Sequence, residues 1–285
     1  MLSYIYGSLV TQKIKKYIPG STTKEFAVVC FVGLAVLTGT VSYLSIFISV
    51  GLLANILILL GAITIVILSL NDFKADLKLR IAQAASYQWY YKLLFLSGLV
   101  FMLYYSTFPS LSGDEATYYA QFIRWTQEYG TVIGLGNIEF RMGFNSHWHV
   151  LTALFNWSYI TTLQSNHING VLYILMLLFC FSGFKQVWGA IRFFKTGMLV
   201  LASLPLLLSY VITTSPDLPC SYYIFVIFIL AFEDAQKNRL FSFSQNLIII
   251  TILSAFLLTV KLSAAIACIL AFIPIDRKSV VWERV

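Results

Sequence analysis

Two adjacent acids open the one long polar segment of the chain, in the stretch "SGDEATYYAQFIRW" at residues 112–125. Ser112, followed three residues later by Glu115, fits a capping box, in which both side chains hydrogen-bond the first backbone amides of a helix. Asp114 is less needed for such a cap. A carboxyl group at the boundary of a low-dielectric medium can have a raised pKa and serve as a general base. Asp114 and Glu115 are therefore the candidate catalytic residues, with helix capping as the alternative role for Glu115.

The residues after this pair predict an amphipathic helix. Tyr118, Phe122, Trp125 and Tyr129 recur at helical spacing, and Gly130 follows as a terminator. Trp and Tyr are enriched at membrane–water interfaces, so we expect this helix to lie along a membrane surface. Tyr118 and Trp125 are candidate substrate-binding residues that would stack on a sugar or line the entry of a lipid.

The glycine-rich stretch "GLGNIEFRMGFNSHWH" at residues 134–149 allows tight turns and close approach of the backbone to a ligand, but it is not a nucleotide-binding loop. Arg141 is a candidate phosphate clamp, because its guanidinium donates paired hydrogen bonds; pairing with Glu139 or with lipid phosphate is the alternative. His147 and His149 share a face of a strand but not of a helix, and no third ligand at known spacing indicates zinc. The candidate substrate-binding residues here are Asn145, His147 and His149, and Trp148 is a further candidate for stacking.

Two further charges lie beside apolar runs. Asp217 stands between Pro216 and Pro219 in "SPDLP", and prolines define the geometry of such a turn. It is a candidate substrate-binding residue, with helix capping as the alternative. Lys261 interrupts an apolar run in "TVKLS", and charges in such runs usually face a cavity or a partner. Lys261 therefore either reaches the interface by snorkelling or binds the phosphate of a lipid-linked donor.

Composition places the chain in a membrane. Its 285 residues are 59% hydrophobic and only 11% charged, with a mean hydropathy of +0.82. Runs such as residues 53–70 lack the alternation of a barrel strand, so they are expected to be helices. The fold class is an all-α polytopic transmembrane helical bundle, with about 7–8 membrane helices. The net charge of +7 is explained by basic residues between apolar runs, so membrane lipid and not nucleic acid is the expected partner.

Counting these runs predicts where the polar segments lie. The N-terminal lysines, in an amphipathic lead-in, and residues 71–92 are expected on the cytoplasmic side, and residues 110–166 on the outer side. A short apolar stretch at residues 150–163 is re-entrant or interfacial. Asp114, Glu115, His147, His149, Asp217 and Lys261 all reach the outer boundary in this count. The expected helices are 26–49, 52–70, 93–109, 168–184, 197–212 and 220–232, followed by a pair that begins near Leu247 and is interrupted by Lys261.

The last ten residues, "DRKSVVWERV", break an apolar run abruptly. They resemble the translated read-through of a common sequencing adapter and are excluded from the fold. We expect residues 1–275 to form one transmembrane domain, the N-terminal part of a longer bundle.

The segment from Gly113 to Val150, "GDEATYYAQFIRWTQEYGTVIGLGNIEFRMGFNSHWHV", resembles a family of uncharacterised bacterial multi-spanning membrane proteins. Those proteins share an acid, a surface helix and a "GLGN…R-GFN" segment. Their layout is similar to that of GT-C glycosyltransferases, which use polyprenyl-phosphate-linked sugars and carry an acidic motif in their first long outer loop. Asp114 and Glu115 match the acidic position, and "SPDLP" and "TVKLS" extend the resemblance to about residues 106–265. Two helices precede the one that leads to the acidic loop here, where the simplest GT-C layout has one.

The resemblance implies a glycosyltransferase that takes sugar from a polyprenyl-phosphate donor at the outer face of the bacterial cytoplasmic membrane. Asp114 would be the base, Glu115 would position the acceptor or a metal ion, and Arg141 and Lys261 would hold the donor phosphate. No cofactor is indicated, and the expected partners are a lipid-linked sugar and membrane lipid. The alternatives are a transporter or flippase, a polymerase for surface polysaccharide or its lipid-linked precursors, and a truncated fragment without function.

Overall fold

The computed structural model describes residues 1–18, 21–108, 112–144, 146–161, 168–185, 189–204, 208–237 and 244–269, and every regular element in these ranges is helical. The predicted all-α class is confirmed. The α-helices are α1 (Leu2–Tyr17), α2 (Phe26–Ser45), α3 (Leu52–Leu68), α4 (Leu70–Ala85), α5 (Trp89–Tyr105), α6 (Ala120–Tyr129), α7 (His147–Phe155), α8 (Ser158–Thr161), α9 (Ile168–Ser182), α10 (Ala190–Ala202), α12 (Asp217–Gln236) and α13 (Gln245–Val260). The π-helix η1 (Glu115–Tyr119) precedes the 3₁₀ helices η2 (Leu135–Asn137), η3 (Phe140–Phe144), η4 (Gly183–Lys185), η5 (Tyr210–Ile212) and η6 (Leu262–Cys268).

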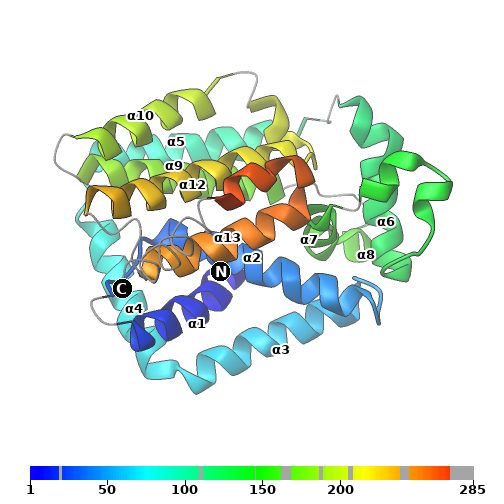
Figure 1. Ribbon diagram of the computed structural model, residues 1–285, viewed down its shortest axis with the longest axis horizontal. Coiled ribbons are helices and arrows are strands. Elements are labelled where there is room, and N and C mark those ends of the chain that lie inside the picture. Colours follow the sequence, from blue (N-terminus) through cyan, green and yellow to red (C-terminus); the bar gives the residue numbers. More distant parts are fainter. Residues whose placement is uncertain are drawn as a thin grey trace, which may run out of the picture.

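The long helices lie side by side, and the shorter helices α6, α7 and α8 gather at one end of the bundle (Figure 1). Helices α2 and α13 finish, and α12 begins, at the end that carries η1, α6, α7 and α8, which we call the loop end. Helix α2 begins, and α12 finishes, at the opposite end, which holds Lys24 and Lys195 and which we call the lysine end. The sequence count predicted this separation of the outer loop from the basic segments. The side of a membrane that each end faces stays a prediction.

Helix α2 is the centre of the bundle. Its 20 residues carry no charge, and most of them are buried, with Phe31, Val32, Leu37 and Val41 fully so. It packs against α1, α3, α7, α9 and α13. Because the helix offers apolar side chains on every face, it is stable only where neighbours or lipid surround it.

Helix α1 is part of the core and not a free lead-in as the sequence suggested. A Cβ atom on Gly7 would lie 1.9 Å from the carbonyl oxygen of Val29, and one on Gly33 would lie 1.6 Å from that of Ser3. Small residues therefore let the backbones of α1 and α2 touch, a common device where helices pack within a membrane. The expected amphipathic lead-in rested on the charges of Lys15 and Lys16, and those charges do not report the close contacts of Gly7 and Gly33.

Gly130 ends α6, as predicted, and docks the loop end onto the turn between α2 and α3. Its φ of +74° suits glycine, and a Cβ there would lie 2.5 Å from the carbonyl oxygen of Ser45. The next amide, of Thr131, donates to that oxygen at 2.7 Å, and the amide of Val50 donates to Thr126 at 3.0 Å. These backbone bonds attach α6 to the end of α2.

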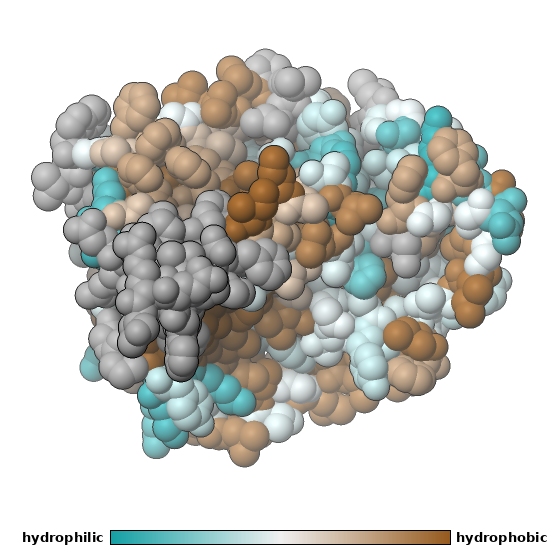
Figure 2. All heavy atoms as spheres, viewed as in Figure 1, coloured by the Kyte–Doolittle hydropathy of each residue, from teal (hydrophilic) through white to brown (hydrophobic). Residues whose placement is uncertain are grey.

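Among the described residues, α2 and α12 are long and apolar enough to span a membrane, and α3 with α4 makes a third candidate if the pair, bent by 93°, counts as one span. The predicted 7–8 membrane helices are therefore not confirmed, because helices such as α9 and α13 are shorter. Large apolar side chains on α3 and α5 are nevertheless exposed, Ile67 by 66% and Leu103 by 57%. Brown residues cover much of the face in Figure 2 between hydrophilic groups at its right and lower left. These features indicate membrane association.

Several predicted boundaries were wrong. Residues 71–92, for which the sequence predicted only the cytoplasmic side, contain nearly all of α4 and the first turn of α5. The helix expected at 93–109 begins at Trp89 and ends at Tyr105, while the one expected at 197–212 divides into α10 and η5. The stretch 150–163 contributes most of α7 and α8. Apolar runs locate a span, but helix ends depend on local turns and caps that hydropathy does not report.

A buried ion pair holds the lysine end together. The Lys195 side chain is fully buried, and its Nζ lies 3.0 Å from both carboxylate oxygens of Glu25 and 2.8 Å from Ser182 Oγ. Because each group has partners, the cost of removing these charges from water is offset. The pair joins α10 and α9 to the start of α2.

Replacing Gly33 by alanine is expected to destabilise the protein by about 1–3 kcal/mol, because the new methyl group overlaps the backbone of α1. Gly39→Ala is the matched control in the same helix, since a Cβ at Gly39 has no atom within 4 Å. The measurement is the thermal unfolding midpoint of each variant in detergent micelles. Equal midpoints for the two variants would contradict the close packing of α1 on α2.

Candidate functional site

Glu115 ties the loop end to the start of α12. It begins the π-helix η1, is 7% exposed, and accepts hydrogen bonds through Oε2 from both the backbone amide and the hydroxyl of Thr214, each at 2.8 Å. Burial raises the pKa of Glu115, and the two bonds from Thr214 work against that rise. A π-helical turn often marks a functional site. Glu115 therefore does more than begin its own helix.

Asp114 lies beside Glu115 but remains accessible. Its carboxylate is 52% exposed, and the nearest cation is Arg141, whose Nη1 lies 3.7 Å from Oδ1. The Arg141 guanidinium also lies over the ring of Tyr118, with 5.8 Å between Cζ and the ring centroid. Exposed pairs at such distances are weak. Asp114 and Arg141 can therefore separate when a ligand offers better partners.

Asp217 and Lys261 form a second ion pair at the same end. Asp217 is the first residue of α12 and Lys261 immediately follows α13, and the Nζ of Lys261 donates to Oδ1 of Asp217. Ser215 Oγ donates to Oδ2 of Asp217 at 3.0 Å. The hydrogen bond with Asp217 raises the pKa of Lys261, and the negative charge of Asp217 adds to the rise, while partial burial opposes it. Tyr118 contacts the guanidinium of Arg141.

The residues that sequence reasoning missed are those that join these groups. Thr214 holds Glu115, Ser215 holds Asp217, and the buried Tyr119 packs its ring 4.4 Å from that of Tyr118. The hydroxyl run "TTS" directly before Pro216 was the available signal, because such residues commonly supply hydrogen bonds at helix starts. Its partner, 99 residues away, could not be inferred.

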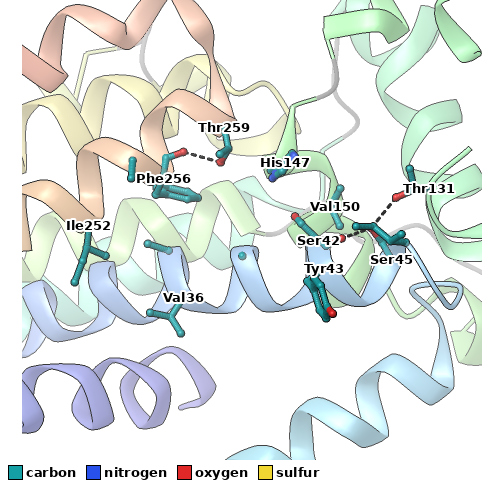
Figure 3. A pocket seen from close by; sticks show the side chains of 14 residues that line it. Val36, Ser42, Tyr43, Ser45, Thr131, His147, Val150, Ile252, Phe256 and Thr259 are labelled. Carbon is teal, nitrogen blue, oxygen red and sulfur yellow. Dashed lines mark hydrogen bonds between the residues drawn. The ribbon is translucent and has the colours of Figure 1, made fainter. Parts of the chain in front are cut away.

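His147 and His149 separate, because both lie in the helix α7 and not in a strand. His149 is 4% exposed and faces Tyr119, with 4.5 Å between ring centroids. Its Nε2 has no hydrogen-bond partner among the described residues. Burial lowers the pKa of His149 to about 4, with a hydrogen bond to the backbone of Thr214 opposing. His147 instead lines a cavity between α2 and α13 (Figure 3).

The two tryptophans that were candidates for stacking lie in different environments. Trp148 is fully buried and donates from Nε1 to Asn169 at 2.8 Å, so it is a core residue and cannot stack on a substrate. Trp125 is partly buried against the core and keeps some exposed surface. Asn145 lies outside the described residues. The structure thus brings Asp114, Glu115, Tyr118, Arg141, Asp217 and Lys261 together, which we call the charged cluster, with His149 behind it.

Within the described part of the chain, no group of three or more His, Cys, Asp or Glu residues is arranged to hold a metal ion. The side chains of the charged cluster themselves offer the exposed carboxylates of Asp114 and Asp217, two cations and a phenol. Such a set can accept a proton and stabilise an anion at the same place.

A family model described as "Domain of unknown function (DUF8201)" matches residues 1–279. The chain belongs to this family. The match includes every element of the charged cluster, and the family's description assigns it no activity. No curated protein matches the chain, and no solved structure matches it.

Glu115→Ala is expected to lower the free energy of unfolding by about 1–3 kcal/mol, because the buried amide of Thr214 loses its acceptor. Glu115→Gln keeps an acceptor oxygen and should retain most of the stability. Glu128→Ala, which breaks only an exposed pair with Arg124 on α6, is the control and should cost about 0.5 kcal/mol or less. Thermal unfolding in micelles measures all three. An alanine variant as stable as the glutamine variant would contradict the role of Glu115.

Acidification from pH 7 to pH 5 is expected to cost about 2 kcal/mol of stability through His149. The imidazole titrates near 6.5 when unfolded and near 4 when folded, so between these values the unfolded state binds the extra proton. This stability is complete above pH 6.5 and is lost as the pH falls toward 4. His149→Phe should therefore show a smaller loss on acidification than the wild type in parallel thermal unfolding at both pH values. The same loss in both proteins would show that His149 is not the titrating group.

Proposed function

We propose that the protein is a membrane glycosyltransferase that transfers sugar from a polyprenyl-phosphate donor to an acceptor hydroxyl. The observation that carries the proposal is the charged cluster, where the exposed carboxylate of Asp114 lies beside Arg141, and the hydrogen bonds from Thr214 to Glu115 bring the Asp217–Lys261 pair to the same end. Asp114 would accept a proton while the cations stabilise a leaving phosphate. GT-C glycosyltransferases, which the sequence resembles, have the corresponding layout.

In the proposed reaction, the acceptor oxygen bonds to the anomeric carbon of the sugar while the bond from that carbon to the phosphate oxygen breaks. The acceptor proton passes to the Asp114 carboxylate. The electron pair leaves with the phosphate, whose growing negative charge is stabilised by Arg141 and Lys261. Glu115, bound to Thr214, would hold η1 so that Asp114 keeps its position.

The placement of ionic groups supports an enzyme over a transporter. The ion pairs among the described residues lie at the two ends of the bundle. Asp114–Arg141 and Asp217–Lys261 lie at the loop end, Glu25–Lys195 and Asp76–Arg80 lie at the lysine end, and Arg124–Glu128 is exposed on α6. A transporter would be expected to hold its polar site near the middle of the bilayer. An enzyme that acts at a membrane boundary is instead expected to hold its ionic groups at one end of the helical bundle.

We further propose that α5, α9, α10 and α13 also cross the membrane, giving the 7–8 spans expected from hydropathy, with the loop end outside the bacterial cytoplasmic membrane. The parallel course of these helices beside α12 in Figure 1 supports this placement. Local bilayer thinning allows spans shorter than the usual length.

Asp114→Asn is expected to reduce sugar transfer at least about 100-fold, because a general base contributes about that factor or more. The assay uses the longest reading frame that contains residues 1–275, reconstituted in liposomes with polyprenyl-phosphate-linked hexoses and pentoses. Mass spectrometry measures the release of polyprenyl phosphate in the presence of membrane extract as acceptor.

Glu128→Gln is the matched control, because it removes an acid from α6 outside the charged cluster. It should keep wild-type activity. Undiminished release by Asp114→Asn would remove Asp114 from the mechanism, and no release by the wild type with any donor would contradict glycosyl transfer itself.

A further inference from the structure

Two cavities adjoin each other at the loop end, beside the charged cluster. The first, the helix groove, has a volume of about 500 Å³ and lies between α2 and α13 at the start of α7 (Figure 3). The second, the glycine cup, has a volume of about 290 Å³ and lies under residues 130–143. Thr131 and Val150 line both cavities. A ligand that fills one therefore reaches the edge of the other.

The helix groove changes character along its length. Its inner part is lined by apolar residues, among them Val36 on α2 and Ile252 on α13, and Gly39 leaves open space between them. Toward the loop end the lining includes the hydroxyl groups of Ser42 and Thr131, and the His147 ring. Such an order, apolar within and polar at the mouth, matches the order of groups in a lipid.

Two polar groups at this mouth can bind a ligand. The buried Oγ of Ser42 has no hydrogen bond among the described residues, and buried polar groups are normally paired. The partly buried His147 ring lies beside it in the lining of the groove. Burial lowers the pKa of His147, so its ring is neutral at pH 7 and offers one donor and one acceptor.

The glycine cup extends this polar mouth. Gly130, Gly134, Gly136 and Gly143 contribute to its wall, where the absence of side chains exposes backbone groups to a ligand. The side chains of Thr126 and Thr131 add hydroxyls. A compact ring with several hydroxyl groups suits such a wall.

None of the described residues that line the groove or the cup is Asp, Glu, Lys or Arg. An ionised phosphate placed there would lose its hydration without gaining a counter-charge, which is costly. A neutral head with hydroxyl groups would lose less and would pair with Ser42 and His147. The cations Arg141 and Lys261 are paired with carboxylates elsewhere.

The volume of the groove indicates one hydrocarbon chain. A group of the size of a water molecule occupies about 30 Å³ of liquid, so about 500 Å³ accommodates on the order of 15 methylene-sized groups. A lipid with two long chains would leave one of them outside.

We propose that the helix groove and the glycine cup bind one uncharged amphiphile, with its single long hydrocarbon chain between α2 and α13 and its hydroxyl-rich head in the cup. This inference goes beyond sugar transfer and does not depend on it. If transfer holds as proposed, the ligand is the acceptor or the product, while the phosphate-linked donor lies at the charged cluster.

Photolabelling of the full chain in nanodiscs prepared without alkyl glycoside detergent tests the proposal. The probes are hexadecyl glucoside and hexadecyl phosphate, each with a diazirine in the chain. We expect the glucoside to label peptides around residues 36–43 and 252–259 at least five times more strongly than the phosphate does. Stronger or equal labelling by the phosphate probe would overturn the neutral head.

Gly39→Trp should reduce labelling by the glucoside at least five-fold, because the indole fills the groove. Gly197→Trp on α10 is the matched control: a Cβ there also has no atom within 4 Å, but the residue does not line the groove. Two further measurements keep the test valid if Gly39→Trp does not fold. Ala255→Phe should block the groove from α13, and unlabelled hexadecyl glucoside should compete with the probe in the wild type. Labelling unchanged by both groove variants and by the competitor would overturn the site. Sugar transfer is measured on the same nanodiscs, so that loss of transfer and loss of labelling are recorded separately.

Discussion

The two hydrogen bonds from Thr214 to the Glu115 carboxylate connect the loop end to the helical bundle. They join residues 99 positions apart, and both are buried, so water does not compete for the donors. They hold η1, which includes Tyr118 and directly follows Asp114, against the segment that leads into α12, where Asp217 pairs with Lys261. Backbone bonds such as that from Thr131 to Ser45 attach α6 to α2, and the Thr214 bonds fix the acid pair itself.

At the loop end, charged and neutral side chains line separate surfaces, and the cost of burying a charge explains this separation. Ionic groups gather where they are partly exposed and paired, because an unpaired charge inside an apolar bundle is expensive. The helix groove lies between α2 and α13 and is lined by neutral groups, with the pKa of His147 lowered by burial. Lys195 is a fully buried cation, and Glu25 and Ser182 compensate its charge. An enzyme that joins a charged donor to a neutral acceptor would need both kinds of surface.

Much of the arrangement could be predicted by counting apolar runs, because each span reverses the direction of the chain. That count brought Asp114, Asp217 and Lys261 to one end, where the structure has them. It could not predict that Lys261 pairs with Asp217, because the partners depend on how α12 and α13 pack. It also did not predict that His147 and His149 point in different directions, because that follows from the helical conformation of α7.

Composition and hydropathy alone establish a helical, membrane-associated chain with an acidic loop at one end, since lipid leaves unpaired backbone groups without partners and so requires helices. Packing decided the rest. The contact of Gly7 and Gly33 with facing backbones made α1 a core helix, and the cavity beside Gly39 exists only because α2 and α13 lie apart there. Such features depend on distances between segments remote in the chain. The acid pair Asp114–Glu115 is visible in the sequence, but its division into an accessible and a buried carboxylate comes from the contact with Thr214.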